Sequence, residues 1–382
     1  MAALKVPVIA FLIAAATCGV ASAGSLRKLW EVNLKKAAAG EGIDQTADLP
    51  VLALRFSPDG GKIAVVAGVS RDETGDHAVS NLLLLDTAGP SPKATRFALP
   101  FSIDETEFGG PLNNFQWSPD GKLIDVGGIV IRLEDHKTCR VPFIGGFTSE
   151  DRVITYDPDA KDFLNAGKRP SHFLVFDAAC TLTGKWTAPE DWYIRDSSPD
   201  RGLLLVGRHL PDRYPLEFET LVVNAIDRTV MGRWPGDEVW ATRFADSGRA
   251  ICGGRNADKA DRVPVICWNA DTGQPIGTAP TVNGGTSFAT AARASRMVAS
   301  DYRRSRIPFS YEYRETLKQR VVWDFGTGKE LVSWYPDKQE YLDRVLRVPR
   351  RTTDFFRFAM SPDGQYIVEG GSGLLRLYKI EP

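Results

Sequence analysis

One short motif recurs along this chain and constrains the fold more than any other feature. Its clearest copies read FSPDGGKIAVV from Phe56, WSPDGKLIDVGG from Trp117, SSPDRGLLLVG from Ser197 and MSPDGQYIVEGG from Met360. Ser-Pro-Asp-Gly is turn chemistry, because Pro presets φ, Asp bonds its own backbone and Gly accepts a positive φ. Apolar segments stand on both sides of each turn. Each copy therefore predicts a strand, a tight turn and a second strand.

Degenerate copies fill the gaps and bring the number of units to seven. They read FTSEDRVITY from Phe147, FADSGRAICGG from Phe244 and FATAARASRMVAS from Phe288. Each unit continues with a third apolar segment, such as HFLVFDAAC or TLVVNAID, and most add a short fourth one, such as VMGRW or ELVSW. Four short strands repeated radially predict an all-β fold, a seven-bladed β-propeller of four-stranded antiparallel blades. The blades begin near residues 53, 114, 145, 193, 240, 286 and 355.

The seventh unit ends at LLRLYKIEP without a fourth strand. The segment LRKLWEVNL, residues 26–34, is apolar enough to supply it. We expect this strand to pair with the edge of the last blade and close the ring, since closure removes an exposed sheet edge. Residues 24–382 then form one propeller domain.

The segment VVWDFGTGKELVSW resembles the end of a WD repeat, with Trp323-Asp324 in the signature place, and ICWNADTGQPIG is similar with Asn269 instead of Asp. Most copies lack the Trp-Asp pair, and the Gly-His signature is absent. The chain therefore resembles a divergent WD-repeat (WD/YVTN-like) propeller of the bacterial secreted kind. That resemblance implies a scaffold that binds partners without catalysis.

The first 23 residues have the form of a secretory signal peptide. A single cation, Lys5, precedes an apolar run from Val6 to Ala16, and Ala21-Ser22-Ala23 suits a signal peptidase. We expect cleavage after Ala23 and a secreted or periplasmic protein without a membrane span. The apolar run is short for a membrane anchor, which needs about 20 residues. The alternative is a lipoprotein anchored through Cys18, but Thr17, which precedes this cysteine, is bulkier than the Gly, Ala or Ser usual at that position.

Cleavage leaves four cysteines, an even number that favours disulfides in an oxidising compartment. Cys252 and Cys267 are expected on neighbouring strands of one hairpin, and Cys139 and Cys180 in connections on the same face of neighbouring blades. We predict a bridge within each pair. Four free thiols are the alternative.

Composition and motifs argue against several functional classes. The 47 Lys and Arg residues balance 48 Asp and Glu residues, whereas a general nucleic-acid binder needs a basic surplus. The sequence has no G-x-S-x-G, H-E-x-x-H or P-loop motif, and its four histidines are scattered. DPDAKDFLNAGK lacks the Gly at the sixth position and the final Glu of a calcium loop. We therefore expect no metal site, no cofactor and no catalysis.

One segment keeps an enzyme alternative open. DFGTGKELVSW, from Asp324, resembles the tryptophan-docking repeat of quinoprotein dehydrogenases, although it occurs once and Trp334 arrives two residues late. A WD-type turn explains Asp324, Thr327 and Gly328 equally well. A lactonase or hydrolase propeller is a further alternative, since one scaffold hosts many functions.

The lengths of the connections distinguish the two faces of the ring. Connections between strands one and two, and three and four, are short, and we name their side the turn face. Connections between strands two and three, and between blades, include long segments such as SDYRRSRIPFSYEYRE and YPDKQEYLDRVLRVPRRTTD. We name their side the long-loop face. Long loops often carry binding sites, so we expect the partner there.

Charge on the long-loop face is uneven. Blade one supplies acids, namely Asp72, Glu73, Asp76, Asp104, Glu105 and Glu107. Blade six supplies arginines interleaved with aromatic rings, which suit recognition of anionic surfaces. The predicted partner-binding residues are Arg303, Arg304, Arg306, Tyr311, Tyr313, Arg314, Arg344, Arg347, Arg350 and Arg351. We expect a monomer that binds a protein or anionic glycan; ion pairs between these arginines and the blade-one acids are the alternative.

Overall fold

The Ser-Pro-Asp-Gly copies form the predicted turns in the computed structural model of the chain. In the first copy, the Ser57 hydroxyl donates to Oδ1 of Asp59 at 2.5 Å and accepts from the amide of Lys62 at 2.9 Å. The same two bonds recur in the turns of Ser118 and Ser361. These local bonds fix where the first strand of a blade ends and the second begins.

The structure describes most of the ring but not every connection. The described residues are 24–39, 49, 51–71, 77–104, 115–142, 144–148, 152–157, 171–189, 192–209, 218–236, 239–255, 265–279, 288–306, 313–334, 357–371 and 373–381. The predicted signal peptide, residues 1–23, lies outside these ranges. Within them, no helix is both long enough and apolar enough to cross a bilayer.

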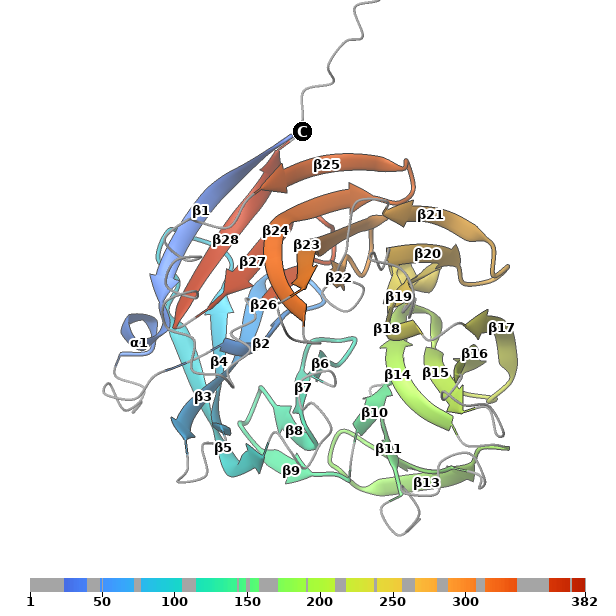
Figure 1. Ribbon diagram of the computed structural model, residues 1–382. Helices are drawn as coiled ribbons and strands as arrows, with labels where there is room; N and C mark the ends of the chain where they lie inside the picture. Colours follow the sequence, from blue (N-terminus) through green and yellow to red (C-terminus); the bar gives the residue numbers. More distant parts are fainter. Residues whose placement is uncertain are drawn as a thin grey trace, which may run out of the picture.

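Seven four-stranded antiparallel sheets surround a central axis, as predicted (Figure 1). Blades 1 to 3 are formed by β2 (Val51–Phe56), β3 (Lys62–Arg71), β4 (His77–Asp86) and β5 (Ala94–Asp104); β6 (Gln116–Trp117), β7 (Leu123–Val126), β8 (Ile129–Arg132) and β9 (Thr138–Arg140); and β10 (Ile144–Phe147), β11 (Val153–Tyr156), β12 (His172–Phe176) and β13 (Leu182–Thr187).

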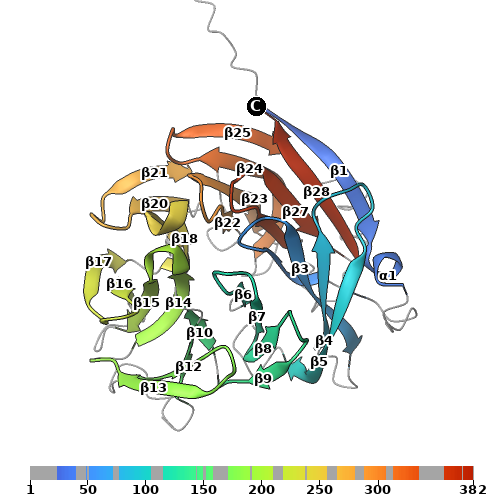
Figure 2. The ribbon, with the colours of Figure 1, turned by 180° about the vertical axis from the view of Figure 1, so that it is seen from behind.

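Blades 4 to 7 follow the same order, with the first strand innermost (Figure 2). Their strands are β14 (Trp192–Ser198), β15 (Leu203–His209), β16 (Phe218–Asn224) and β17 (Val230–Gly236); β18 (Val239–Ala245), β19 (Ala250–Arg255), β20 (Val265–Asn269) and β21 (Pro275–Ala279); β22 (Phe288–Thr290), β23 (Arg296–Arg306), β24 (Tyr313–Asp324) and β25 (Lys329–Trp334); and β26 (Arg357–Met360), β27 (Tyr366–Gly370), β28 (Leu374–Glu381) and β1 (Ser25–Asn33). The short helix α1 (Leu34–Ala37) follows β1, and 3₁₀ turns occupy Pro199–Arg201 and Asp246–Gly248.

The predicted closing strand completes blade 7. β1 pairs antiparallel with β28, from Ser25 opposite Glu381 to Asn33 opposite Leu374. The blue and red strands lie side by side in Figures 1 and 2. Trp30 is buried against the core of blades 7 and 1. The edge left by β28 is therefore covered by the other end of the chain.

The hydrophobic core lies between neighbouring blades. The central strands β3 and β4 bury consecutive apolar residues, Ile63–Ala67 and Leu82–Leu85. Their side chains divide between two clusters, one shared with blade 7 and one shared with blade 2. Burial on both faces explains why these strands are continuous apolar runs rather than alternating ones.

The turn face is also tied together between blades. The amide of Arg293, in blade 6, donates to the carbonyl of Pro362, in blade 7, at 2.7 Å. The amide of Ser247, in blade 5, donates to the carbonyl of Ala292, in blade 6, at 2.5 Å. The turns therefore fix the spacing of these blades as well as their own strands.

Candidate functional site: a projecting hairpin and a central cavity

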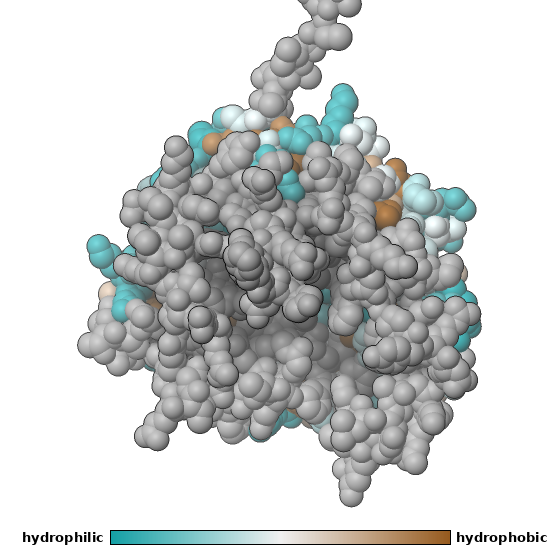
Figure 3. Space-filling model, viewed as in Figure 1, coloured by the Kyte–Doolittle hydropathy of each residue, from teal (hydrophilic) through white to brown (hydrophobic). Residues whose placement is uncertain are grey.

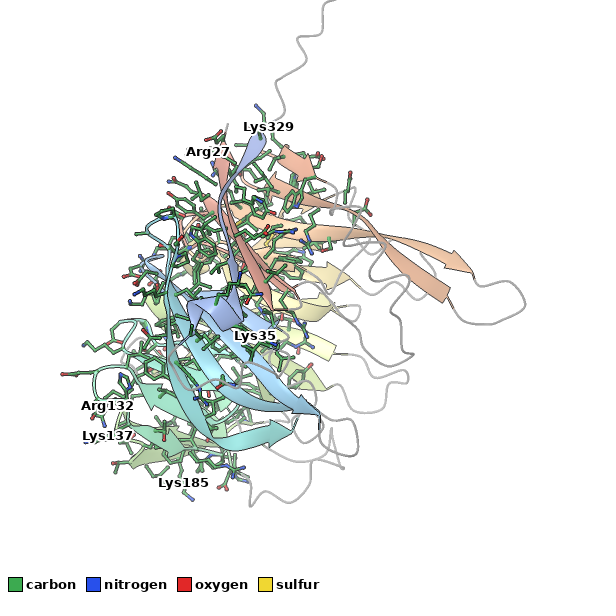
Figure 4. The ribbon with its side chains drawn as sticks, turned by 90° about the vertical axis from the view of Figure 1, so that its left-hand side faces the viewer. Arg27, Lys35, Arg132, Lys137, Lys185 and Lys329 are labelled. Atoms are coloured by element: carbon green, nitrogen blue, oxygen red, sulfur yellow. A yellow bond between two sulfur atoms is a disulfide. The ribbon has the colours of Figure 1, made fainter. Side chains whose placement is uncertain are left out.

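The β23–β24 hairpin of blade 6 extends beyond its neighbours in the sheet. Among the described residues, β22 pairs with β23 up to Ala299, and β25 pairs with β24 from Arg320 onward. The β23–β24 ladder nevertheless continues to Arg306. In Figure 4 the orange hairpin projects away from the ring, on the side opposite the labelled Arg132 and Lys137. We name its outer part, residues 301–306 and 313–319, the arm.

The arm contains half of the predicted partner-binding residues, namely Arg303, Arg304, Arg306, Tyr313 and Arg314. The register places Arg304 opposite Glu315 and Arg306 opposite Tyr313. The other predicted residues, Tyr311, Arg344, Arg347, Arg350 and Arg351, lie outside the described residues. The segment read as a loop from the sequence is thus largely a hairpin, because the paired strands of blade 6 simply continue their ladder.

A buried ion pair anchors the base of the arm to the next blade. Nη1 of Arg320, in β24, bonds Oε1 of Glu369, in β27, and their side chains are 4% and 7% exposed. The Arg320 guanidinium also lies 5.0 Å from the centre of the Phe358 ring. A charge buried this deeply needs its partner, so the pair fixes the arm relative to blade 7.

Blade 1 extends on the same side of the ring as the arm (Figure 4). β2 pairs with β3 as far as Ala67, whereas β3 continues to Arg71, opposite His77. β5 accompanies this extension, because its last residue Asp104 lies opposite Ala78. The other predicted blade-one acids, Asp72, Glu73, Asp76, Glu105 and Glu107, lie outside the described residues.

A cavity of about 430 Å³ occupies the centre of the ring. It is lined by the innermost strands of six blades, β2, β6, β14, β18, β22 and β26, and by turns such as those of Pro58, Pro119 and Pro362. The cavity therefore reaches toward the turn face, away from the arm. Its volume lies in the range of small-ligand pockets, about 300–1,000 Å³.

The repeat places one residue of each blade at the same position in this cavity. The position lies two residues before the turn residue equivalent to Ser57, and it is occupied in chain order by Arg55, Gln116, Gly146, Asp196, Arg243, Ala289 and Ala359. All of these except Gly146 line the cavity. We name all seven residues, Gly146 included, the inner ring. Its charged and polar members come from blades 1, 2, 4 and 5, and its alanines from blades 6 and 7.

The glycine in the inner ring allows contact between blades that are not neighbours. The Ser197 hydroxyl, in blade 4, donates to Oε1 of Gln116, in blade 2, at 3.3 Å. A Cβ at Gly146, in blade 3, would meet Oγ of Ser197 at 3.1 Å and Oε1 of Gln116 at 3.6 Å. A side chain on blade 3 would therefore separate these two groups.

The guanidinium groups of Arg55 and Arg243 lie in the same cavity, where their positive charges repel each other. Nε of Arg55 donates to the Phe115 carbonyl at 3.2 Å, and Nη1 of Arg243 donates to the carbonyls of Thr242 and Arg195 at 2.9 and 3.3 Å. Burial, and then the charge of Arg243, lower the pKa of Arg55 to about 10, while Asp196 acts in the opposite direction. Like charges held together in a recess are characteristic of functional sites.

The turn that kept the quinoprotein alternative open has a structural role. Oδ1 of Asp324 accepts the amides of Gly326 and Thr327 at 2.9 and 3.2 Å and the Ser295 hydroxyl at 2.9 Å. Asn269 accepts two amides in the same way in blade 5. Asp324 therefore holds the turn between β24 and β25, as expected of a WD-type turn. Among the described residues, no three His, Cys, Asp or Glu side chains gather as a metal site.

Both predicted cysteine pairs lie at disulfide distance. Cys252 and Cys267 are directly opposite in the β19–β20 ladder, with 4.1 Å between their Cα atoms. Cys139, in β9, and Cys180, in the turn after β12, join blades 2 and 3 with a Cα–Cα distance of 6.3 Å. The first pair staples one blade, and the second staples two blades together.

The coloured rim in Figure 3 mixes hydrophilic side chains with small hydrophobic areas. The exposed large hydrophobic residues of the described ranges come from four different blades: Leu182, Ile226, Met231, Ile276 and Leu374. Single exposed hydrophobic residues are normal on soluble proteins, so this rim identifies no site.

Known structures share the fold of this chain. A chain in the crystal structure of a mitotic checkpoint complex is similar with a TM-score of 0.53 and 14% identity, covering 99% of this chain and 100% of that one. The WD40 domain of Neurospora crassa Pan2 is similar with a TM-score of 0.54 and 11% identity, covering 94% and 96%. No protein-family model and no curated protein sequence matches the chain.

The fold is thus a WD40-type seven-bladed β-propeller. Because 735 chains of solved structures match it, the likeness describes the scaffold and not a particular activity. The sequence reading missed the inner ring. The signal was present, since the seven residues stand at one fixed distance before each turn, but each of them reads alone as an ordinary strand residue.

Proposed function

We propose that this protein is a non-catalytic binding propeller outside the cytoplasm, and that the arm contacts its partner. The observation that carries the proposal is the arm itself. Its ladder continues beyond the part of the sheet that pairs with β22 and β25 among the described residues, and its sequence concentrates arginines and tyrosines on the long-loop side. Arginine and tyrosine are enriched in protein interfaces.

The proposed partner is an anionic protein or glycan surface. Arginine makes bidentate hydrogen bonds to carboxylate and phosphate groups and stacks on planar rings. The near-zero net charge of the chain favours a localised anionic contact over general binding to nucleic acid. The proposal of a secreted or periplasmic location rests on the leader-like residues 1–23, and two disulfides suit such an oxidising compartment.

The neighbours are consistent with a binding role. One of them is part of a mitotic checkpoint complex, which is an assembly of proteins. Propellers use exposed loops and edges for such contacts while the blades stay rigid. We extend this mode of action to the present chain through the arm.

The test removes the arm without touching the blade. Residues 302–318 are replaced by Asn-Gly, which joins the paired residues Asp301 and Gln319 by a two-residue hairpin turn. A matched control replaces residues 68–80 of blade 1, between the paired Ala67 and Asn81, in the same way. Both variants and the intact chain are used as bait on secreted and periplasmic extracts, and captured partners are quantified by mass spectrometry.

We expect capture to be lost with the arm and retained in the blade-one control, while the melting temperature changes by less than about 4 °C in both. Replacement of Arg303, Arg304, Arg350 and Arg351 by Ser should weaken capture and flatten its salt dependence. Unchanged capture by the arm-trimmed chain would place the contact elsewhere.

A further inference from the structure

The inner ring is rich in hydrogen-bond donors and poor in acceptors. The Nη1 and Nη2 atoms of Arg55 have no hydrogen-bond partner among the described residues, and the same is true of Nη2 of Arg243. Neither guanidinium forms an ion pair within the described ranges. Both side chains line the same cavity. Such donors are normally satisfied when they are recessed in a protein.

Gln116 adds a third donor to this cavity. Its Oε1 accepts from Ser197, so its Nε2 amide must serve as a donor, yet Nε2 is buried without a partner. The residue is only 8% exposed. An unpaired buried amide costs about 1–3 kcal/mol, which suggests that something absent from the protein itself accepts this bond.

Among the described residues, neither acid that lines the cavity forms a hydrogen bond or ion pair with these donors, and the charge of Asp196 offsets that of Arg55 only in part. Oδ2 of Asp196 accepts the backbone amide of Phe244 at 2.7 Å. Asp200 lies 3.7 Å from Arg293, which forms its own pair at the turn face. Arg357 adds a further cation to the lining. Cations therefore outnumber acids, and the two carboxylates present already have partners.

We propose that the central cavity binds a small oxyanion, a compound with a carboxylate or phosphate group, between Arg55, Arg243 and Gln116. Guanidinium forks and an amide match the oxygen atoms of such groups. The small side chains of Ala289 and Ala359 leave the room that the rest of the ligand occupies. Burial is the main cause of the lowered pKa of Arg55 and the charge of Arg243 is the second, and an anion between the two guanidiniums relieves this second contribution.

The cavity site is independent of the arm and does not rest on the proposed function. It lies on the innermost strands and reaches toward the turn face, whereas the arm projects from the other side. An arm-trimmed chain should therefore bind the oxyanion as well as the intact chain does.

Isothermal titration with inorganic phosphate, pyrophosphate and citrate at constant ionic strength tests the proposal. We expect saturable one-to-one binding of at least one probe below about 10 mM, weakened at least about tenfold in Arg55→Gln and in Arg243→Gln. Selectivity for pyrophosphate or for citrate will distinguish a phosphate ligand from a carboxylate ligand. Lys137→Gln and Lys185→Gln, which remove one charge each on the outside of the ring, should bind like the intact chain.

Ala289→Leu provides a second test that changes no charge. It fills the cavity beside the guanidiniums, so binding should fall at least about tenfold while the protein stays folded. Without the probe, Arg55→Gln should melt at the same or a higher temperature, because one of two repelling charges is gone. The proposal is overturned if no probe binds saturably, if the Ala289→Leu protein binds normally, or if the Lys137 and Lys185 variants lose binding equally.

Discussion

The turn between β26 and β27 and the arm of blade 6 lie at opposite ends of neighbouring blades and are held in different ways. In the turn, Oγ of Ser361 accepts the amide of Tyr366 and donates to Asp363, so local side chains define the backbone. In the part of the chain that the structure describes, the backbone ladder of the arm runs between its own two strands and continues past the pairing with β22 and β25. Individual side-chain hydrogen bonds define the turn, whereas the arm forms by continuation of the backbone ladder.

This difference places the rigid part of the fold on the turn face and the hairpins that can vary in length on the long-loop face. Because the turns and the bonds between them fix the blades, the opposite face can lengthen its hairpins without disturbing the ring. The arm and the blade-one extension are instances of such lengthening. Under the proposed function, the residues that contact a partner differ from those that hold the fold, so mutations can distinguish the two.

Removal of the closing strand should have the largest effect on stability, because it opens the ring of blades on which both the turn and the arm are built. Deletion of residues 24–36 takes away β1 together with Trp30 and Leu34, which are 4% and 0% exposed. Large buried side chains contribute about 3 kcal/mol each, so unfolding should need at least about 5 kcal/mol less free energy. Thermal denaturation followed by circular dichroism measures this.

A chain that lacks only residues 1–23 is the control and should melt like the full-length chain. A normal transition after deletion of residues 24–36 would mean that the ring does not depend on closure by β1.

The next effect should come from the base of the arm. Glu369→Gln leaves Arg320 buried without its charged partner, and we expect a loss of about 3 kcal/mol in urea denaturation. Replacement of both residues by Met should restore stability to within about 1 kcal/mol of the intact chain, since neither charge of the pair is then left unpartnered by the other. If the double variant is no more stable than the single one, the pair acts by shape rather than by charge.

The smallest expected effect is a difference in how stability depends on pH between two aspartates that each accept a backbone amide in a turn. The Ser57 hydroxyl, followed by the Gly61 amide, lowers the pKa of Asp59 at the turn face. Burial raises the pKa of Asp125 well above its ordinary 3.8, although Asp125 accepts the Gly128 amide at 3.0 Å. The two groups should therefore affect stability with opposite signs as the pH changes.

The folded state binds a proton at Asp125 more tightly than the unfolded chain does, so this group lowers stability as the pH rises above 3.8. Asp125→Asn should stabilise the protein by about 1 kcal/mol at pH 8 and give no gain near pH 3. Asp59 stabilises above its ordinary pKa and loses this effect as the pH falls. Asp59→Asn should thus cost less than about 0.5 kcal/mol at neutral pH because the site is exposed. Urea titrations from about pH 3 to pH 8 decide, and equal slopes for both variants would refute the assignment.

The sequence predicted those features that depend on local chemistry. Turns such as that of Ser57, the closing strand and the Cys252–Cys267 register follow from residues close together or from a regular pattern. The arm was read as a loop because Arg303 to Arg306 and Pro308 do not resemble a strand, whereas the ladder of blade 6 carries through to Arg306. The inner ring was missed because its members come from separate blades. The leader and the partner stay predictions.

The pairing of β1 with β28 affects how the chain folds during its synthesis. Glu31 bonds Arg376, a residue that leaves the ribosome 345 positions later. Six blades can form from neighbouring hairpins, but the seventh must wait until its two halves meet across the whole length of the chain. Such distant contacts make folding slow, so the nascent propeller spends time as an open horseshoe with an unpaired edge. That interval, rather than the finished ring, is when the protein is most exposed to aggregation.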